Sequence, residues 1–291
     1  MSAIILETKN LTHIYSKGTT SQVDAIRDVC LQIEKGELVG VIGHTGSGKS
    51  TLIQHFNGLL KATSGTVLLD GEDIWKDKTK VRNARFRVGL CFQYPEYQLF
   101  EETVYKDIAF GPKNMKLDEA EIDKRVRSVI RFVGLDESYL DKSPFDLSGG
   151  EKRRVAIAGV MAMQPEVLIL DEPCAGLDPK GRETILSMIK SYQKETGSTL
   201  LVVSHSMEDI SKIATKVLVM NESKLAYYDT VDNVFSHAEE LKKMGLNIPQ
   251  LTQLFLKLKQ KGYDVDVNVY TLEKAKDELL RLIKGGALYD K

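Results

Sequence analysis

Short apolar runs recur along most of the chain, and their lengths match those of buried β-strands. Five such runs lie at residues 38–42, 88–92, 167–170, 200–203 and 217–220. A strand that faces water on one side alternates apolar and polar residues, whereas continuous runs are typical of parallel strands covered on both faces. Because segments with helical character separate several of the runs, the pattern predicts an α/β fold with a mostly parallel sheet and helices on both faces.

Two regions depart from this alternation of runs and helical segments. Near the start, apolar residues cluster at 4–6 and recur at every second position from Val29 to Ile33, which predicts the strands of an N-terminal β subdomain. Between the runs at 88–92 and 167–170 helical patterns dominate, and residues 118–133 repeat apolar side chains at the spacing of one helix face. We therefore expect a helical subdomain inserted at about residues 95–163.

The pattern changes again beyond Asp229. A predicted helix begins at Pro249 and ends before Gly262, residues 263–269 alternate as a half-buried strand does, and residues 272–284 predict a last helix. The sequence thus divides into a main domain at residues 1–230 and a small α/β appendage at residues 231–291. No residues with an evident chemical role lie in the appendage, and stabilising a dimer is the task we expect of it.

Composition fits a globular protein and excludes two classes of partner. Apolar residues make up 42% of the 291 positions, enough for the core of one large α/β unit. With 40 basic and 41 acidic side chains, no overall field attracts the chain to nucleic acid or anionic lipid. The basic segment 76–87 lacks the repeated aromatic residues that stack on bases, so we expect a solvated surface there and no nucleic-acid partner.

Cysteines and apolar lengths indicate the cellular setting. Cys30, Cys91 and Cys174 are widely spaced and lack metal-ligand spacing, which predicts buried or half-buried thiols in a reducing compartment. No apolar run approaches the roughly 18 residues that a membrane-spanning helix needs, and the N-terminus lacks the organisation of a signal peptide. If the protein serves a membrane, another chain must supply the membrane span.

The run at 38–42 leads into a phosphate-binding pattern, G-x-x-x-x-G-K-[ST], ahead of a helix predicted at about residues 49–60. The candidate nucleotide-binding residues of this loop are Gly43, His44, Thr45, Gly46, Ser47, Gly48, Lys49, Ser50 and Thr51. Glycines let backbone N–H groups turn toward phosphates, and the helix presents its positive end to them. Lys49 is expected to reach the β- and γ-phosphates of ATP and Ser50 to bind Mg²⁺. A plain glycine-rich turn is the alternative, and the buried strand before the loop argues against it.

A pair of carboxylates follows the run at 167–170. Asp171 and Glu172 emerge at the C-terminal end of a predicted buried strand, where ligands bind in open α/β sheets. The alternative, two acids that cap a helix ahead of Pro173, is less attractive because a phosphate-binding loop lies upstream.

A second anion site is indicated by the segment LSGGE at 147–151. Ser148, Gly149 and Gly150 precede a helix predicted to begin near Glu151, again a place for backbone N–H groups to meet an anion. The glycine-rich loop at 43–51 already provides one phosphate-binding site, so the local sequence does not explain why the chain carries a second candidate anion site.

These three motifs together resemble the nucleotide-binding subunit of an ATP-binding cassette (ABC) transporter, over about residues 3–230. The resemblance implies a P-loop ATPase in which Asp171 holds Mg²⁺ and Glu172 polarises the attacking water. It further implies that Gln93 contacts Mg²⁺ and water and that His205 contacts the γ-phosphate. Tyr15 stands where the family stacks an aromatic ring on adenine, although packing is an alternative for this side chain.

The same resemblance explains the second anion site. In the family two subunits pack head to tail, and each LSGGE segment closes over the γ-phosphate held by the other subunit. Residues 175–178, Ala-Gly-Leu-Asp, resemble the loop that links the two sites, with a departure from the commoner Ser-Ala-Leu-Asp.

Residues 92–100, FQYPEYQLF, resemble the ATPases of energy-coupling factor (ECF) transporters, which import vitamins and transition-metal ions. This version of the segment is similar to that of the second of two paralogous ATPases. The resemblance implies a paralogous ATPase as partner, or a second copy of this chain, together with a transmembrane scaffold subunit and a substrate-binding membrane subunit. It places the protein at the cytoplasmic face of the cell membrane.

Aromatic and apolar side chains at Tyr94, Tyr97, Leu99 and Phe100 would suit a groove that receives a helix of a membrane subunit. A buried connection inside the helical insertion is the alternative. Other candidate functions are the ATPase of a conventional importer or exporter, a soluble ABC protein that acts on ribosomes or DNA, and a nucleotide-binding module without hydrolysis. A ribosome-type protein usually carries two cassettes in one chain, and a module without hydrolysis would lack Glu172 or His205.

Overall fold

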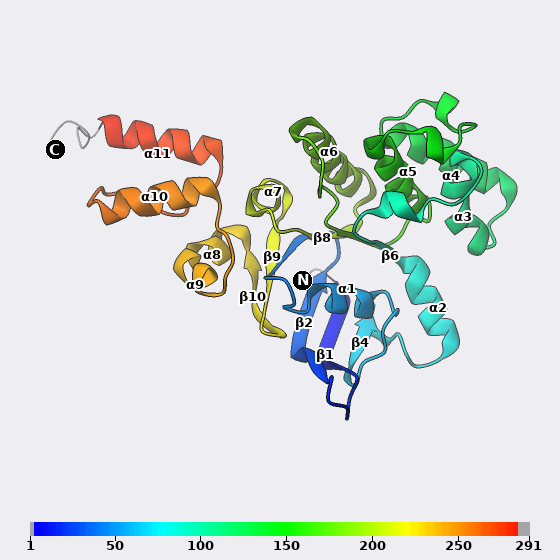
Figure 1. Ribbon diagram of the computed structural model, residues 1–291, viewed down its shortest axis with the longest axis horizontal. Coiled ribbons are helices and arrows are strands. Elements are labelled where there is room, and N and C mark those ends of the chain that lie inside the picture. Colours follow the sequence, from blue (N-terminus) through cyan, green and yellow to red (C-terminus); the bar gives the residue numbers. More distant parts are fainter. Residues whose placement is uncertain (1–2, 285–291) are drawn as a thin grey trace.

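The computed structural model describes residues 3–284, and within them a six-stranded sheet forms the centre of the molecule (Figure 1). The strands lie in the order β10-β9-β3-β8-β7-β6; all are parallel except β10, which runs antiparallel at one edge. Their bounds are β3 (Leu38–Ile42), β6 (Val88–Cys91), β7 (Val167–Asp171), β8 (Thr199–Val203), β9 (Lys216–Asn221) and β10 (Lys224–Thr230). The five apolar runs are therefore the five parallel strands, and the predicted α/β class is confirmed.

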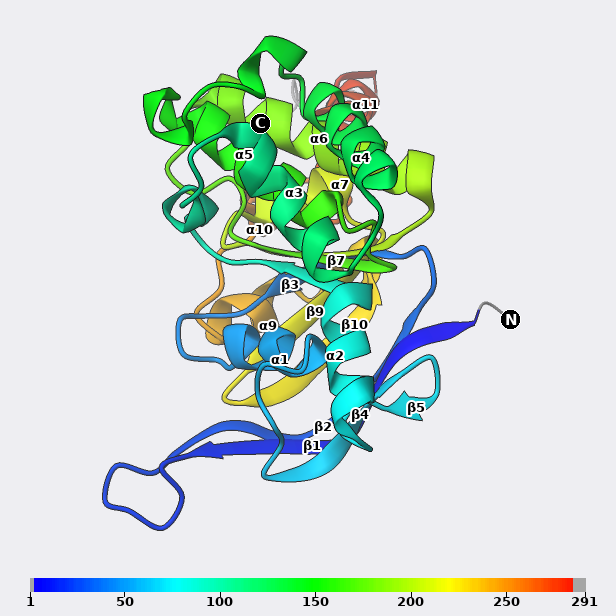
Figure 2. The same ribbon diagram turned by 90° about the vertical axis from the view of Figure 1, so that its right-hand side faces the viewer.

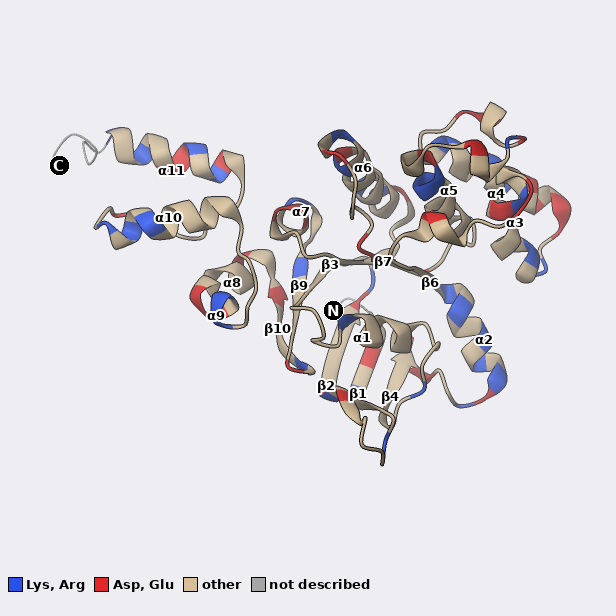
Figure 3. Ribbon diagram, in the orientation of Figure 1, with Lys and Arg blue, Asp and Glu red and all other residues tan. Residues whose placement is uncertain are grey.

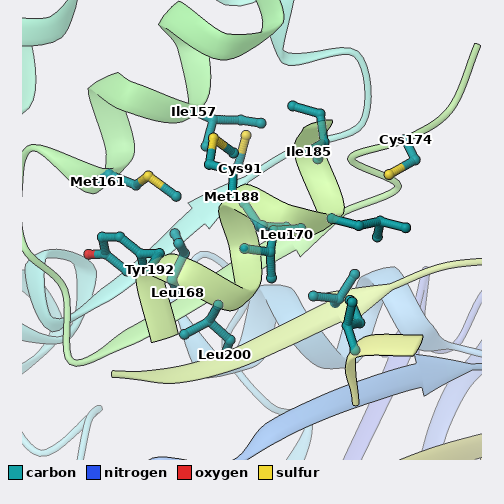
Figure 4. Packing of buried hydrophobic residues seen from close by; sticks show 14 of the residues in the cluster. Cys91, Ile157, Met161, Leu168, Leu170, Cys174, Ile185, Met188, Tyr192 and Leu200 are labelled. Carbon is teal, nitrogen blue, oxygen red and sulfur yellow. The ribbon is translucent and has the colours of Figure 1, made fainter. Parts of the chain in front are cut away.

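The strands are continuously apolar because each faces two cores. In β7, Leu168 and Leu170 pack on the side of α5 (Gly149–Met161) and α6 (Pro179–Thr196), whereas Ile169 packs on the side of the N-terminal sheet. Figure 4 shows Leu168 and Leu170 beside the side chains of α6. Since both sets are buried, both faces of the strand are apolar over residues 167–170.

A second, antiparallel sheet packs against the central one and carries the strand order β2-β1-β4-β5. Its members are β1 (Ile4–Tyr15), β2 (Val23–Glu34), β4 (Ser64–Leu69) and β5 (Glu72–Asp73). Helix α1 (Lys49–Phe56) lies in the core that joins the two sheets, with Leu52, Ile53 and Phe56 fully buried. This helix ends before the predicted residue 60, because Gly58 adopts a left-handed backbone conformation with φ of 69° that breaks the helical turn.

Residues between β6 and β7 are helical, as the sequence pattern predicts (Figures 1 and 2). They comprise η1 (Pro95–Gln98), α3 (Val104–Asn114), α4 (Glu119–Phe132), η2 (Glu137–Tyr139), η3 (Pro144–Asp146) and α5. Helix α4 begins where Asp118 accepts a hydrogen bond from the backbone N–H of Glu121, an N-cap that satisfies one otherwise free amide. Its apolar face, including Val126 and Ile130, packs into the same core as α5 and α6.

Within residues 3–284 four further helices follow β10; α8 packs against β9 and β10, whereas α10 and α11 lie farther from the sheets (Figure 1). They are α8 (Val231–Ser236), α9 (Ala238–Lys243), α10 (Gln250–Gln260) and α11 (Leu272–Lys284). The predicted helices α10 and α11 are confirmed, and residues 285–291 of the predicted appendage lie outside the described residues.

The predicted strand at residues 263–269 is wrong. Val265 and Val269 are buried as the alternation required, but they pack between α10 and α11 in a small separate core. The backbone there bonds to side chains: Thr252 Oγ1 donates to the carbonyl of Val269, and Asp266 N–H donates to Glu278. The alternation therefore correctly predicted that Val265 and Val269 are buried. It did not predict the backbone conformation, because among the described residues this segment has no neighbouring strand to pair with.

The basic segment lies on the surface as expected, whereas one of the three cysteines differs from its prediction. Helix α2 (Lys78–Arg87) carries the basic segment on an exposed face (Figure 3), where Lys80 pairs with Glu72 and Arg87 with Glu166. Cys30 is exposed, not buried, because its strand position faces away from the core, whereas Cys91 and Cys174 are buried free thiols.

Across residues 3–284 no helix combines the length and the apolar character that crossing a bilayer requires.

The remaining helices, α6 and α7 (Met207–Ile213), cover the central sheet on the face opposite α1 (Figure 1). Helix α6 begins at Pro179 after Asp178 caps it by accepting the N–H of Gly181 at 2.8 Å. The loops that end at these two helices begin at the C-terminal ends of β7 and β8. Residues for binding and chemistry can therefore gather along one edge of the sheet.

Candidate nucleotide-binding and hydrolysis site

The glycine-rich loop joins the C-terminal end of β3 to the first turn of α1. Gly48 is the N-cap of α1, and no side chain caps the helix, which leaves its first N–H groups available to an anion. Gly48 adopts φ of 101°, and a Cβ at this position would lie 2.3 Å from the carbonyl oxygen of Ala25. Only glycine therefore fits where the loop passes β2.

Lys49 is held across the mouth of this loop. Its Nζ donates to the carbonyl oxygens of Gly43 at 2.7 Å and His44 at 3.0 Å. The residue is buried, and this burial lowers the pKa of the ammonium, while Glu172 and Asp171 act in the opposite direction. A cation with two neutral carbonyl partners and two carboxylates nearby is placed to meet further negative charge.

Asp171 and Glu172 lie at the C-terminal end of β7, and Asp171 contacts the first turn of α1 directly after the glycine-rich loop. Asp171 Oδ2 accepts a hydrogen bond from Ser50 Oγ at 3.4 Å. Burial raises the pKa of Asp171, and Lys49 and Ser50 oppose the rise. The structure thus brings Asp171 next to Lys49 and Ser50, which lie more than 100 positions earlier in the sequence.

Glu172 has the properties of a group that exchanges a proton near neutral pH. Burial, and then the charge of Asp171, raise the pKa of its carboxyl to about 7. Its backbone adopts φ of 50°, a left-handed conformation that a residue other than glycine rarely takes and that is common at functional sites. Glu172 N–H donates to the carbonyl of Val203 at 3.0 Å, which fixes the strained residue to β8.

His205 follows β8 and faces Glu172. Its Nε2 lies 3.5 Å from Glu172 Oε1, and its side chain is 56% exposed, so one end of the ring is open to a ligand. Burial and the charge of Lys49 lower the pKa of this imidazole, which favours the neutral ring. Gln93 is exposed just beyond the end of β6, the strand next to β7, and no hydrogen bond in the described residues joins it to Asp171 or Glu172.

The donor set at Ser50 and Asp171 fits Mg²⁺. A hydroxyl and a carboxylate oxygen within 3.4 Å of each other are hard oxygen ligands, and a nucleotide's phosphate oxygens would complete an octahedral shell. The fit rests on chemistry and proximity, since Mg²⁺ is bound with few protein ligands and several others from water and phosphate.

Tyr15 lies at the end of β1 over the P-loop helix. Its hydroxyl is 3.3 Å from Thr51 Oγ1, and the residue is 39% exposed, so a face of the ring is available for stacking. Behind it the ring of His13 makes an edge contact at 4.5 Å between centroids, and His55 of α1 contacts His13 at 4.8 Å. Sequence reasoning missed His13 and His55, because each lies inside an otherwise ordinary apolar segment.

The buried histidine pair makes stability depend on pH. Burial, and then the neighbouring His13, lower the pKa of His55 from 6.5 to about 4. The unfolded chain therefore binds the proton first, so stability is lost as the pH falls from about 6.5 towards 4. We expect His55→Leu to remove this contribution, which is worth about 1 kcal/mol of unfolding free energy between pH 7 and pH 5.5. Urea unfolding at both pH values measures it.

A matched control for that experiment is His237→Gln, since the His237 side chain is 44% exposed. The control leaves His55 in place, so it should still lose about 1 kcal/mol of unfolding free energy between pH 7 and pH 5.5. An equal loss of stability on acidification in the parent and in His55→Leu would contradict the assignment.

The LSGGE segment is preorganised at the start of α5. Ser148 Oγ accepts the N–H of Glu151 at 3.4 Å and Glu151 Oε2 accepts the N–H of Ser148 at 2.8 Å, which together form a capping box. The helix therefore begins at Gly149, two residues before the predicted start, because Ser148 and not Glu151 caps it. The Ser148 hydroxyl donates to Glu151 Oε2 at 2.7 Å, and this bond, the one from the Ser148 N–H and one from the Tyr139 hydroxyl lower the pKa of Glu151 to about 2.

The LSGGE segment at residues 147–151, called the signature segment from here on, does not lie next to the phosphate-binding loop of its own chain. Ser148, Gly149 and Gly150 are exposed, and α5 and α1 lie apart in both views of the molecule (Figures 1 and 2). Ser148 and Gly150 instead line a hollow of about 250 Å³ with Leu177 and Asp178. The two segments predicted to bind anions thus lie apart within one chain, and their role in anion binding stays a prediction.

Sequence comparison places this arrangement among known proteins. The family model for the ABC transporter matches residues 26–175. The chain is 56% identical over 283 residues to the energy-coupling factor transporter ATP-binding protein EcfA2 of Clostridium tetani, covering 97% of this chain and 98% of the relative. EcfA2 of Clostridioides difficile is 52% identical over 290 residues, covering 99% of this chain and 100% of the relative.

Solved structures agree with the sequence match. CbiO1 from Clostridium perfringens, part of the ABC transporter complex CbiONQ, is similar with a TM-score of 0.74 and 40% identity over 87% of this chain and 99% of its own. The ATP-binding cassette MJ0796, solved as a dimer after hydrolysis with ADP and Pi, is similar with a TM-score of 0.69 and 27% identity, covering 78% of this chain and 99% of its own.

Proposed function

We propose a function from the premise that this chain belongs to the ABC transporter family and, within it, to the energy-coupling factor transporter ATP-binding proteins. It binds and hydrolyses ATP to power the import of vitamins or other micronutrients through membrane subunits. The observation that carries the proposal is the length of the match, since EcfA2 of Clostridium tetani and of Clostridioides difficile are aligned over 97% and 99% of this chain, well beyond the phosphate-binding core. The proposal places the protein at the cytoplasmic face of the membrane as a peripheral subunit.

The residues at the C-terminal ends of the strands would have separate roles in binding ATP and in its hydrolysis. The loop amides at residues 43–51 and Lys49 would hold the β- and γ-phosphates, and Tyr15 would stack on the adenine. Bound through Ser50 and Asp171, Mg²⁺ would neutralise phosphate charge. Glu172 would accept a proton from the attacking water, for which its pKa of about 7 is well matched, and His205 would hold the γ-phosphate and Gln93 the water.

The exposed signature segment supports a composite site. Ser148, Gly149 and Gly150 have their N–H groups at the start of α5 and no phosphate-binding loop of their own chain opposite them. In a head-to-tail dimer with a paralogous ATPase, or with a second copy of this chain, they would cover the partner's γ-phosphate. The neighbouring residues 175–178 would then lie at the dimer interface, beside the hollow that Ser148 and Gly150 share with them.

Exposed aromatic residues after β6 support docking of a membrane subunit. Tyr97 is 84% exposed and Phe100 is 58% exposed, whereas Leu99 is half-buried against the core. The alternative, a buried connection, therefore applies to Leu99 alone. Exposed aromatic rings on a surface are a preferred contact for the apolar face of a partner helix.

Tyr97→Asp is expected to abolish co-purification of the ATPase with its membrane subunits, because burying a carboxylate in an apolar contact costs several kcal/mol. Tyr97→Phe is the matched control and should still co-purify, since it keeps the ring. The isolated Tyr97→Asp protein should bind ATP and unfold at the parent's temperature because the residue is exposed. Recovery of an intact transporter complex with Tyr97→Asp would count against this docking surface.

A further inference from the structure

One buried arginine of α5 joins two segments that have different tasks in the proposed function. Arg153 lies on α5, four residues beyond Gly149, and is 3% exposed. Its Nε and Nη2 donate to the two carboxylate oxygens of Glu96 at 3.0 and 2.6 Å. Its Nη1 donates to the carbonyl oxygens of Pro173 at 3.3 Å and Ala175 at 2.5 Å.

The three partners lie in η1 and in the loop between β7 and α6. Glu96 lies in η1, three residues after Gln93 and one before the exposed Tyr97. Pro173 directly follows Glu172, and Ala175 begins the loop at 175–178 that lies beside the signature segment. The guanidinium also lies 5.9 Å from the ring of Tyr94, a residue held in a left-handed conformation with φ of 55°.

This geometry suits arginine and no other cation. A planar guanidinium can bind a carboxylate with two parallel bonds and still donate to carbonyls with its remaining N–H, whereas lysine offers a single ammonium on a flexible chain. Because the charge is buried, losing Glu96 would leave it uncompensated, so the two side chains act as one unit. A shift of η1 would therefore pull on the backbone next to Glu172.

We propose that Arg153 is a positioning residue that transmits movement of the membrane-facing segment 94–100 to the Glu172 carboxylate and to the partner-facing loop 175–178. This inference rests on the proposed function, because the segment moves only if a membrane subunit docks on it. Arg153 touches neither nucleotide-binding loop residues nor the reacting atoms; it acts through Pro173 and Ala175.

Packing alone is the competing explanation, and the chain contains a control for it. Arg125 of α4 is also largely buried in the helical insertion, pairs with Glu121 at 2.7 Å and donates to the carbonyls of Ala162 and Met163. Its bonds stay within the insertion, so it has the chemistry of Arg153 without the link to Glu172. Arg125→Lys is therefore a matched control for Arg153→Lys.

The experiment uses the complete transporter complex and the isolated ATPase pair, with kcat and KM for ATP measured in both. Arg153→Lys is expected to lower kcat by roughly 10- to 100-fold, as a misplaced catalytic group does, while KM changes less than about 2-fold. Stimulation of hydrolysis by the membrane subunits should be lost. Glu96→Gln should give the same pattern, and the double variant should be no slower than either single one.

Three results would overturn the inference. The first is a kcat and a stimulation by membrane subunits in Arg153→Lys and Glu96→Gln that equal those of the parent. The second is a loss of kcat in Arg125→Lys as large as that in Arg153→Lys. The third is a rise of KM for ATP in Arg153→Lys and Glu96→Gln as large as the fall of kcat. Should Arg153→Lys fail to fold, Glu96→Gln alone decides, since it keeps the shape of the side chain. A parent complex that hydrolyses no ATP would overturn the proposed function together with this inference, whereas an active parent with unaffected variants would overturn this inference alone.

Discussion

Glu172→Gln is expected to bind ATP as tightly as the parent and to hydrolyse it about 10²- to 10⁴-fold more slowly. The amide has nearly the shape of the carboxyl but is a far weaker base, so the water loses its proton acceptor. Loss of the charge also removes one of the groups that raise the pKa of the neighbouring ammonium of Lys49, without removing any hydrogen bond to Lys49. Phosphate release from the assembled ATPase pair and equilibrium ATP binding measure the two effects.

Glu166→Gln is the matched control, because Glu166 directly precedes β7 as Glu172 directly follows it. Glu166 pairs with Arg87 on the surface, at the end of the strand away from the site. The control should hydrolyse ATP at the parent's rate. If Glu172→Gln also turned over at that rate, another group would have to activate the water.

Lys49→Ala is expected to weaken ATP binding to this chain by about 10- to 100-fold, the worth of a charge-assisted hydrogen bond to phosphate. The buried ammonium now bound to the carbonyls of Gly43 and His44 would be gone, and the phosphates would be left to backbone amides and Mg²⁺. Labelling of the purified pair with a photoreactive ATP analogue measures nucleotide on each chain separately. Unchanged labelling of this chain would refute the role of Lys49.

Ser148→Arg extends the same experiment to the composite site. A long cationic side chain would block the approach of Gly149 and Gly150 to the partner's phosphate, so label should be retained on this chain and lost from its partner. The substitution also removes the cap of α5, at a cost of about 1 kcal/mol, which thermal unfolding monitors. Ser138→Arg, at another exposed serine of the helical insertion, should change neither label. Equal loss of label from this chain in Lys49→Ala and Ser148→Arg would show that the sites are not shared.

The candidate site could be found from sequence where its residues follow directly from a strand. A buried strand and the loop after it are contiguous in sequence. The apolar run before Gly43 or Asp171 therefore predicts where the strand ends and which side chains follow it. The same holds for LSGGE, whose serine and glutamate cap a helix within four residues. In these places the chain itself fixes which backbone groups face a ligand.

Local patterns failed where a partner lies far along the chain. The alternation at 263–269 predicted a strand, but a strand forms only with a neighbour, and the buried valines instead pack between two helices. Cys30 lies between Val29 and Leu31, so the alternation of β2 already placed it on the face opposite the buried residues, and the expectation of a buried thiol overlooked this local pattern. The length of α1 depended on Gly58 taking a left-handed conformation, which sequence allows but does not require.

By itself the sequence determined the fold class and located the candidate phosphate-binding loop, the paired carboxylates and the second candidate anion site, because the residues of each motif are contiguous. Only the tertiary structure decided the strand order that sets Asp171 beside Ser50, the contact of Tyr15 with Thr51 and the buried pair of His13 and His55. It alone revealed Arg153 bound to Glu96, 57 positions away. Such contacts are made by burial and by the closing of long loops, and neither leaves a periodic trace in the order of the amino acids.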